Sequence, residues 1–442
     1  MRHGACMHRV SVSPGFAVLP PSGQRKPWHS DTLQKEGHPA IWKDGKLLEE
    51  ACRWLNEEIV PTRESPKTWA QAAQSLLTWL DFLEAADIDW RHATKDDLTA
   101  YRDAYLGAVS PQTGQEYSPN TVRTRMVYIV NFINFAVEQD WIDSDLRAGS
   151  RMLPPRRHRP IDSDALAHIR KGAPPVVEEA AASAVRLNKL LPKAGQDDTV
   201  RVLRREELNA LLGWAGPRPS ERTPEDGGSD RDYIVFALGW AVGLRVQEVA
   251  DVPVLPFLEM VPNPQFLGEF FKLSVRGKGN KTRPVDVPAW LVIDIQAYID
   301  GERRRALHKR GRNARESQLI LNSEHSTRTG RPMTKAAMQA LMERACERAG
   351  LMMQNERVNP ETGEVAVTPV PRFSMHCLRH TYAVMTYHNQ IKSEYSNLDA
   401  WKYIQEQLGH KSPQTTINTY LKHLSTWADV RQARSLLEVL GR

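Results

Sequence analysis

Cysteine is scarce in this chain of 442 residues, and no two cysteines stand close together in the sequence. The four cysteines are Cys6, Cys52, Cys346 and Cys377. Zinc sites and dithiol redox centres are usually marked by a Cys-x-x-Cys pair, so the sequence predicts neither. Reduced thiols are the simplest interpretation, and they favour a protein of the cytoplasm.

Long apolar runs are also missing. No stretch approaches the roughly 20 apolar residues that a helix needs to cross a bilayer, so no membrane association is expected. Residues 1–23 lack an apolar stretch that ends in a small-residue cleavage site, and we predict no secretion signal. The 14 histidines are not grouped with carboxylates or thiols at metal-binding spacing. We therefore expect no metal and no other cofactor, and a metal-dependent nuclease ranks low.

What the chain does have is a mild excess of positive charge. Its formal net charge is +6 and its isoelectric point is about 9.0. This balance permits nucleic-acid binding without establishing it, because many proteins are equally basic. Short basic runs at 156–159, 201–205, 276–283 and 303–305 fit a DNA contact or a solvated surface equally well.

The order of patterns along the chain predicts two domains. Residues 1–45 show no periodicity and are expected to form an irregular N-terminal arm. Residues 46–146 carry apolar side chains at helical spacing, which predicts a small helical bundle. Prolines punctuate residues 147–196 and indicate a linker, and residues 197–442 form the larger domain.

Local signals place several elements within these domains. Thr94 is a predicted N-cap for a helix over 95–106, and Ser118, which precedes a proline, predicts the start of the next helix. Alternation on both sides of a Gly-x-Gly-Asn turn predicts a β-hairpin over 271–287. The rest of the larger domain is expected to be helical, with a loop near 354–372. The predicted fold class is mainly α, with a small antiparallel β-hairpin in the C-terminal domain.

Five short segments of the larger domain carry side chains suited to phosphate chemistry. Arg245 lies in an apolar context with Glu248 one helical turn later, where the carboxylate can hold the guanidinium. His376 and Arg379 are spaced i, i+3 and can address one phosphate from one helix face. Either pattern alone also occurs as an ordinary surface pair.

The remaining segments are weaker when taken singly. Lys278 stands at the hairpin turn between two glycines, which let the backbone come close to a nucleic-acid strand. His410 and Tyr420 lie ten residues apart near the C-terminus. A lysine-rich turn is usually solvated and a lone tyrosine is usually packing, so these residues matter only in combination.

In combination, the segments resemble the tyrosine recombinase, or phage integrase, family. GLRVQEV resembles its first-arginine box, RGKGNKTRPV its hairpin lysine segment, HCLRHTYA its HxxR box, and LGHKSPQTTINTY its second-histidine and tyrosine segments. All stand in the family's order within similar apolar surroundings. Residues 65–145 resemble the family's helical core-binding domain, a DNA-binding domain, and 199–214 resemble the opening of its catalytic domain.

The resemblance implies a DNA strand-exchange enzyme that needs neither metal nor ATP. Tyr420 would attack a DNA phosphodiester and leave a 3′-phosphotyrosine and a free 5′-hydroxyl. Arg245 and Arg379 would stabilise the charge that builds on the non-bridging oxygens. The family implies that His376 assists the tyrosine proton and that His410 hydrogen-bonds the phosphate.

Two lysines remain candidates for the general acid. The resemblance implies that Lys278 protonates the leaving 5′-oxygen, but 253–270 looks like an insertion, and in another hairpin register Lys281 takes that role. Glu248 and His380 are expected to support the catalytic groups. Contacts to DNA outside the reacting phosphate are expected from Thr121, Arg123, Arg125, Arg276 and Lys281.

Two other functions share much of this residue set. A type IB topoisomerase resembles these enzymes in its arginine, lysine, histidine and tyrosine residues, and would relax supercoils as a monomer. A non-catalytic DNA-binding relative would keep the fold alone. The helical region at 65–145 and the HxxR spelling favour the recombinase over the first, and the complete set of motif residues favours it over the second.

The implied partner is double-stranded DNA. Recombination joins two duplexes, so a tetramer on DNA is expected, and accessory DNA-bending proteins remain open. Apolar residues at helical spacing over 424–440 fit docking on a neighbouring protomer or packing on their own domain. The long N-terminus and proline-rich linker favour a mobile-element integrase that acts at the bacterial nucleoid.

Overall fold

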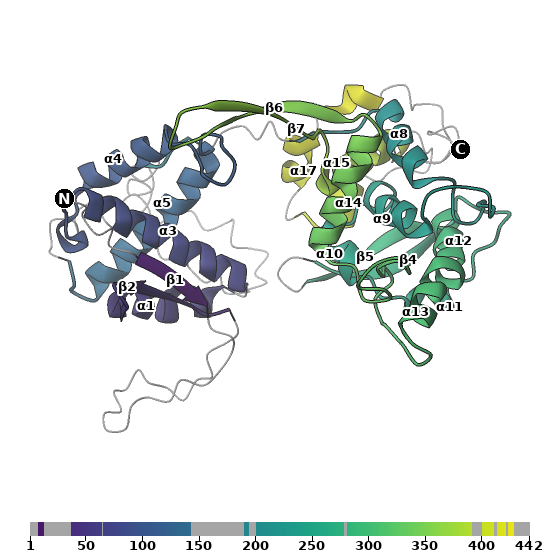
Figure 1. Ribbon diagram of the computed structural model, residues 1–442, viewed down its shortest axis with the longest axis horizontal. Coiled ribbons are helices and arrows are strands. Elements are labelled where there is room, and N and C mark those ends of the chain that lie inside the picture. Colours follow the sequence, from purple (N-terminus) through teal and green to yellow (C-terminus); the bar gives the residue numbers. More distant parts are fainter. Residues whose placement is uncertain are drawn as a thin grey trace, which may run out of the picture. The chain divides into compact units, whose positions relative to one another are not determined.

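A computed structural model of the chain describes residues 8–12, 37–63, 65–142, 190–193, 200–277, 281–390, 400–410, 413–420 and 423–427 (Figure 1). The structure divides into two compact units. The first comprises Met1–Gln196 and Glu356–Ala366, and the second comprises Asp197–Asn355 and Val367–Arg442. Most of the linker predicted over 147–196 lies outside the described residues.

Helices make up most of the first unit. They are α1 (Glu49–Trp54), α2 (Val60–Thr62), α3 (Pro66–Ala85), α4 (Lys95–Leu106) and α5 (Pro119–Glu138). Both predicted N-caps are confirmed. The Thr94 hydroxyl accepts a hydrogen bond from the Asp97 amide at 3.3 Å, and the Ser118 hydroxyl accepts one from the Thr121 amide at 3.2 Å. Each hydroxyl thereby satisfies an amide that the first helical turn leaves unpaired.

Three short strands also belong to the first unit. The antiparallel order is β1 (His8–Val12), β2 (Pro39–Lys43) and β3 (Lys46–Leu47). Val10 pairs with Ile41, which is fully buried against the helical core. The expectation of an irregular arm over 1–45 is therefore wrong for β1 and β2. They are too short to show a clear alternation, and their stability comes from packing on α3.

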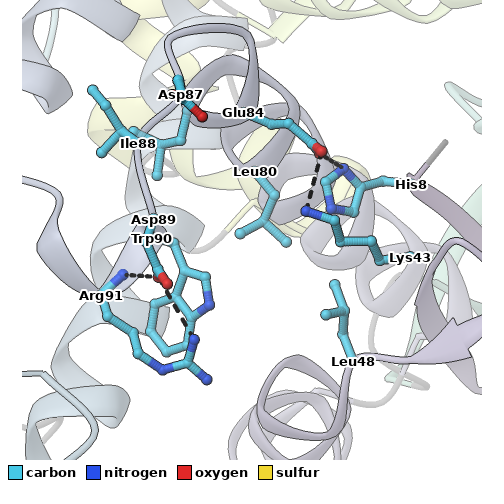
Figure 2. Close-up of a pocket in the computed structure, with 11 residues that line it drawn as sticks. His8, Lys43, Leu48, Leu80, Glu84, Asp87, Ile88, Asp89, Trp90 and Arg91 are labelled. Atoms are coloured by element: carbon cyan, nitrogen blue, oxygen red, sulfur yellow. Dashed lines mark hydrogen bonds and ion pairs between the residues drawn. The ribbon is translucent and has the colours of Figure 1, made fainter. Parts of the chain in front are cut away.

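Polar side chains of β1 and β2 contact carboxylates of α3 (Figure 2). The His8 ring nitrogen Nδ1 lies 2.6 Å from the Asp81 carboxylate and 3.3 Å from that of Glu84, and Lys43 Nζ lies 3.1 Å from Glu84. His8, Lys43 and Glu84 border a pocket of about 440 Å³ that Trp90 also lines. The hydrogen bond between His8 and Asp81 links β1 directly to α3.

The second unit is also mainly helical, which confirms the predicted fold class. Its helices are α8 (Arg205–Ala215), α9 (Asp230–Trp240), α10 (Val246–Asp251), α11 (Leu255–Glu259), α12 (Ala289–Tyr298), α13 (Arg304–Arg310), α14 (Lys335–Arg348), α15 (Met375–Gln390), α16 (Ala400–Leu408) and α17 (Pro413–Tyr420). The core forms around α9, which packs along α15 (Figure 1). Across the described part of both units, none of the helices has the length and apolar character needed to span a membrane.

The predicted β-hairpin is present in the second unit as β4 (Phe270–Arg276) and β5 (Thr282–Pro288). Alternate residues of each strand face the core, and these are Leu273, Val275, Val285 and Val287. Lys278, at the turn, lies outside the described residues. The two strands of the hairpin are therefore anchored in the core of the second unit.

A second hairpin replaces the loop expected near 354–372. Its strands are β6 (Met352–Val358) and β7 (Val365–Pro371), and Gly363 in the turn has a φ of +72°. The loop prediction failed because both strand faces are largely exposed, so no alternation of apolar residues marks them. Residues Glu356–Ala366 group with the first unit, where the Val358 amide donates to the Gly114 carbonyl at 2.8 Å. The predicted larger domain therefore does not include this end of the hairpin.

Candidate active site

Helix α15 holds one arginine inside the second unit. Arg379 is only 1% exposed. Its Nη1 donates to the Gly243 carbonyl at 2.5 Å, and its Nη2 donates to the Leu408 carbonyl. One acceptor lies in the turn after α9 and the other at the end of α16, far apart in the sequence, so the guanidinium is fixed in one orientation. His376, one turn earlier on the same helix, is exposed.

The turn between α9 and α10 places the second arginine. Gly243 has a φ of +74°, and a Cβ there would lie 2.4 Å from the Tyr382 ring. Only glycine fits this turn without strain, and the turn leads directly into Arg245. Glu248 accepts hydrogen bonds from the Arg245 amide at 2.8 Å and from its Nη1 at 2.9 Å. The expected Arg245–Glu248 pair is therefore present.

Sequence reasoning missed a third arginine of the site. Arg283 on β5 donates through Nη1 and Nη2 to the two oxygens of Glu248, at 2.7 and 2.8 Å. Its Nε donates to the Gln407 carbonyl at 2.8 Å. Its place opposite Val275 in the hairpin register was the available signal, because that position faces the interior. In the sequence Arg283 stands out only as one member of the basic run 276–283.

The three guanidinium groups share one carboxylate. Burial alone would raise the pKa of Glu248, but hydrogen bonds from Arg283 and the Arg245 amide, and the nearby positive charges, hold it at about 2. Burial, together with the positive charge of Arg245, lowers the pKa of Arg379 to about 9, so it stays cationic at neutral pH. Among these groups positive charge exceeds negative charge, which is the electrostatic setting of an anion-binding site.

Tyr420 ends α17 and is 1% exposed. Its hydroxyl lies 3.0 Å from Nδ1 of His380, and its ring lies nearly parallel to that of His410 at 6.3 Å. Burial raises the pKa of Tyr420 to about 12, although the charges of Arg379 and Arg245 oppose this shift. The phenol is therefore neutral in the DNA-free protein.

The chain beyond the tyrosine is held on the same unit. Trp427 is fully buried, and its Nε1 donates to the Leu203 carbonyl at 2.8 Å. Leu424 packs against the same core. This start of the apolar C-terminal pattern packs on its own unit, and the rest of the pattern lies outside the described residues.

The histidines of the site have lowered affinities for protons. His410 accepts or donates a hydrogen bond with Thr416 at 2.8 Å, and burial with the nearby arginine charges lowers its pKa to about 4. Partial desolvation and the charges of Arg379 and Arg245 lower the pKa of His376. Both rings are uncharged at neutral pH and can donate one proton or accept one.

The structure brings five of the six predicted catalytic residues into one unit around a common centre. They are Arg245, His376, Arg379, His410 and Tyr420. Lys281 is exposed, and its carbonyl accepts from the Gly277 amide at 2.8 Å, which closes the described end of the hairpin. Arg276 is exposed on the same hairpin.

The predicted DNA contacts of the first unit lie on the first turns of α5. Thr121 is exposed and hydrogen-bonds the Ser118 hydroxyl at 2.9 Å. Arg123 donates to the Pro192 carbonyl at 2.9 Å. Arg125 lies over the rings of Tyr105 and Tyr117, at 4.9 and 4.3 Å. Both arginines already have partners within the unit, and their role toward DNA stays a prediction.

Comparison with known proteins agrees with this arrangement. The pattern of the phage integrase family matches residues 201–426. The chain is similar to tyrosine recombinase XerC of Halalkalibacterium halodurans, with 24% identity over 353 residues, 80% of this chain and 86% of that protein. It is also similar to tyrosine recombinase XerD of Agrobacterium fabrum, with 27% identity over 217 residues, 48% of this chain and 54% of that protein.

A solved structure supports the fold. The XerH site-specific recombinase, bound to palindromic difH substrate in a post-cleavage complex, matches with a TM-score of 0.51 and 16% identity over 85% of this chain and 81% of that one. The family pattern itself covers more than half of the 442 residues. The chain therefore belongs to the phage integrase family and is a site-specific recombinase of the tyrosine class.

Proposed function

We propose that Tyr420 is the nucleophile of this recombinase. Its hydroxyl oxygen attacks the phosphorus of a DNA phosphodiester, and the bond from phosphorus to the 5′-oxygen breaks. The products are a 3′-phosphotyrosine and a free 5′-hydroxyl. Because the energy of the phosphodiester is kept in the covalent link, the 5′-hydroxyl of another strand reseals it without ATP.

The observation that carries this proposal is the buried positive centre beside a buried tyrosine. Arg379 is held by two backbone carbonyls and Arg245 by Glu248, so neither guanidinium needs to reorganise when charge develops on the phosphate. Fixed donors aimed at developing charge are usually the largest catalytic contribution. The same charges lower the cost of ionising Tyr420 during the attack.

Proton transfer completes the reaction. We propose that His376 assists the removal of the phenol proton and that His410 hydrogen-bonds the phosphate. Both rings are neutral and border the arginine centre. A hairpin lysine, Lys278 or Lys281, gives its proton to the leaving 5′-oxygen. These roles follow the resemblance, and the lowered pKa values of the two histidines support theirs.

The wider setting is part of the same proposal. Double-stranded DNA is the substrate, bound through phosphate contacts of the basic residues in both units. Strand exchange between two duplexes requires four protomers, and we propose a tetramer on DNA. We further propose a mobile-element integrase of the bacterial cytoplasm that acts at the nucleoid, with accessory DNA-bending proteins as candidate partners.

The test is to express the protein and its Tyr420→Phe variant in cells, lyse under denaturing conditions, and sequence the covalently attached DNA. We expect adducts at discrete positions for the wild type and none for the variant. Tyr387→Phe is the matched control, because Tyr387 packs on Trp401 and has no part in the proposed chemistry. Adducts scattered evenly along DNA would favour a topoisomerase, and equal adducts from Tyr420→Phe would refute the assignment.

A further inference from the structure

The hydroxyl of Tyr420 has a hydrogen-bond partner to which the resemblance gives no role in the chemistry. His380 follows Arg379 on α15, and its Nδ1 lies 3.0 Å from Tyr420 Oη. The two residues lie 40 positions apart, so this contact joins the HxxR helix directly to the tyrosine helix.

Packing fixes the orientation of this imidazole. His380 is 8% exposed, and its ring meets that of His376 edge-on, with 4.5 Å between centroids and 78° between planes. On the other side its ring lies tilted against Tyr420 at 5.4 Å. A ring held between two neighbours presents Nδ1 to the phenol in one direction only.

The protonation states determine which group donates. Burial, with the neighbouring His376 and Arg379, lowers the pKa of His380 to about 3, and burial raises that of Tyr420 to about 12. Both groups are neutral at pH 7, and in the ring tautomer that carries its proton on Nε2 the Nδ1 atom is free to accept a hydrogen bond from the phenol O–H. Complete transfer of the phenol proton to His380 is strongly uphill in the DNA-free protein, which argues against His380 as the base.

We propose that His380 is the positioning residue for the nucleophile, with Nδ1 accepting the hydrogen bond of the Tyr420 hydroxyl and keeping the phenol in one orientation before DNA arrives. This inference rests on the proposed role of Tyr420. The benefit is entropic: a nucleophile already held in place does not lose rotational freedom when the phosphate binds, and small misplacements of reacting atoms are costly.

The first test needs no DNA. The full chain is labelled with 3-fluorotyrosine, and the Tyr420 resonance among the 11 tyrosines is identified by its loss in Tyr420→Phe. We expect His380→Leu to shift this resonance. His388→Leu is the matched control, because His388 is another buried histidine of α15 whose hydrogen bond goes to the Leu424 carbonyl. An unchanged Tyr420 resonance in His380→Leu would overturn the proposal.

The second test measures cleavage. A duplex carrying the recovered site is nicked so that the covalent intermediate is trapped, and adduct formation is followed in a single turnover at saturating protein. We expect His380→Leu to slow this step by roughly 100-fold with unchanged DNA affinity. His380→Asn places an amide oxygen close to the position of Nδ1 and should restore the rate to within a few-fold, whereas His380→Gln, with its oxygen nearer the position of Nε2, should not.

Each outcome separates the two ideas. If His380→Leu cleaves like the wild type, or if Asn and Gln are as impaired as Leu, His380 does not position the nucleophile through Nδ1. If the wild type itself forms no adduct, the proposed function fails, and the positioning role fails with it. In that case the fluorine resonance still reports whether the His380–Tyr420 contact exists.

Discussion

The Glu248 carboxylate accepts two parallel hydrogen bonds from Arg283, from Nη1 to Oε1 at 2.7 Å and from Nη2 to Oε2 at 2.8 Å. The same carboxylate holds Arg245 at 2.9 Å and lies 3.7 Å from Arg379. One buried acidic group thus joins the hairpin strand β5, the start of α10 and the helix α15. The arginines keep their positions because this carboxylate separates their charges.

Glu248→Gln should therefore be one of the most destabilising single changes in the second unit. Glutamine keeps the shape but leaves three guanidinium groups without their common counter-charge, and we expect a loss of about 3 kcal/mol or more in unfolding free energy. Urea unfolding measures it. Glu221→Gln is the control, because Glu221 also pairs with an arginine but is exposed, and its loss should stay within about 1 kcal/mol. Equal losses for both variants would contradict the central role of Glu248.

The choice between Lys278 and Lys281 as general acid is open to a chemical test. Alanine at the true acid should slow cleavage of an ordinary duplex by roughly 100-fold or more, because the 5′-oxygen then leaves without a proton. A substrate with sulfur at that bridging position should cleave at nearly the wild-type rate, since a thiolate needs no proton to leave. If the sulfur substrate restores the cleavage rate of one alanine variant, the lysine replaced in that variant is the general acid. If it restores neither rate, another residue has that role.

Gly243 is expected to be irreplaceable for stability and for the site together. In Gly243→Ala the new methyl group would lie 2.4 Å from the Tyr382 ring at a φ of +74°. We expect a loss of about 2 kcal/mol or more, with slower cleavage because the Gly243 carbonyl also holds Arg379.

Gly213→Ala is the matched control for this glycine. Gly213 lies in α8, and a Cβ there would meet no atom within 4 Å. Alanine has a higher helix propensity than glycine, so this change should raise the free energy of unfolding slightly, by up to about 1 kcal/mol. If both alanine variants unfold at the same temperature, the strain argued for Gly243 is absent.

The parts of this protein that could be predicted from its sequence are those set by short-range rules. Thr94 and Ser118 cap helices because each hydroxyl satisfies an amide three residues away, and such signals are local. The β4–β5 hairpin could be predicted because its inward-facing residues alternate with outward-facing ones. The pairing of Arg245 with Glu248 also depends on helical spacing alone.

The parts that could not be predicted depend on contacts between distant segments. Nothing near Arg283 in the sequence says that its partners are Glu248 and the Gln407 carbonyl, 35 and 124 residues away. The contact of His380 with Tyr420 likewise exists only once α15 and α17 are packed. Strands β6 and β7 escaped detection for another reason, since their exposed faces carry no apolar alternation.

The buried histidines should make the second unit sensitive to mild acid. The pKa of His380 is lowered to about 3 and that of His410 to about 4, whereas an ordinary histidine has a pKa of 6.5. Below pH 6.5 the unfolded chain therefore binds protons at these positions while the folded protein does not. Stability is complete above pH 6.5 and is lost progressively as the pH falls toward 3.

Urea unfolding at several pH values between 7.5 and 4.5 measures this loss. His380→Asn removes one titrating group, so its unfolding free energy should fall less steeply with acid, by up to about 1.4 kcal/mol per pH unit. At pH 7.5 the variant is expected to be the less stable of the two, because it lacks the packed ring, and the difference should narrow toward pH 4.5. Parallel pH profiles for the two proteins would mean that His380 is not kept uncharged by its burial.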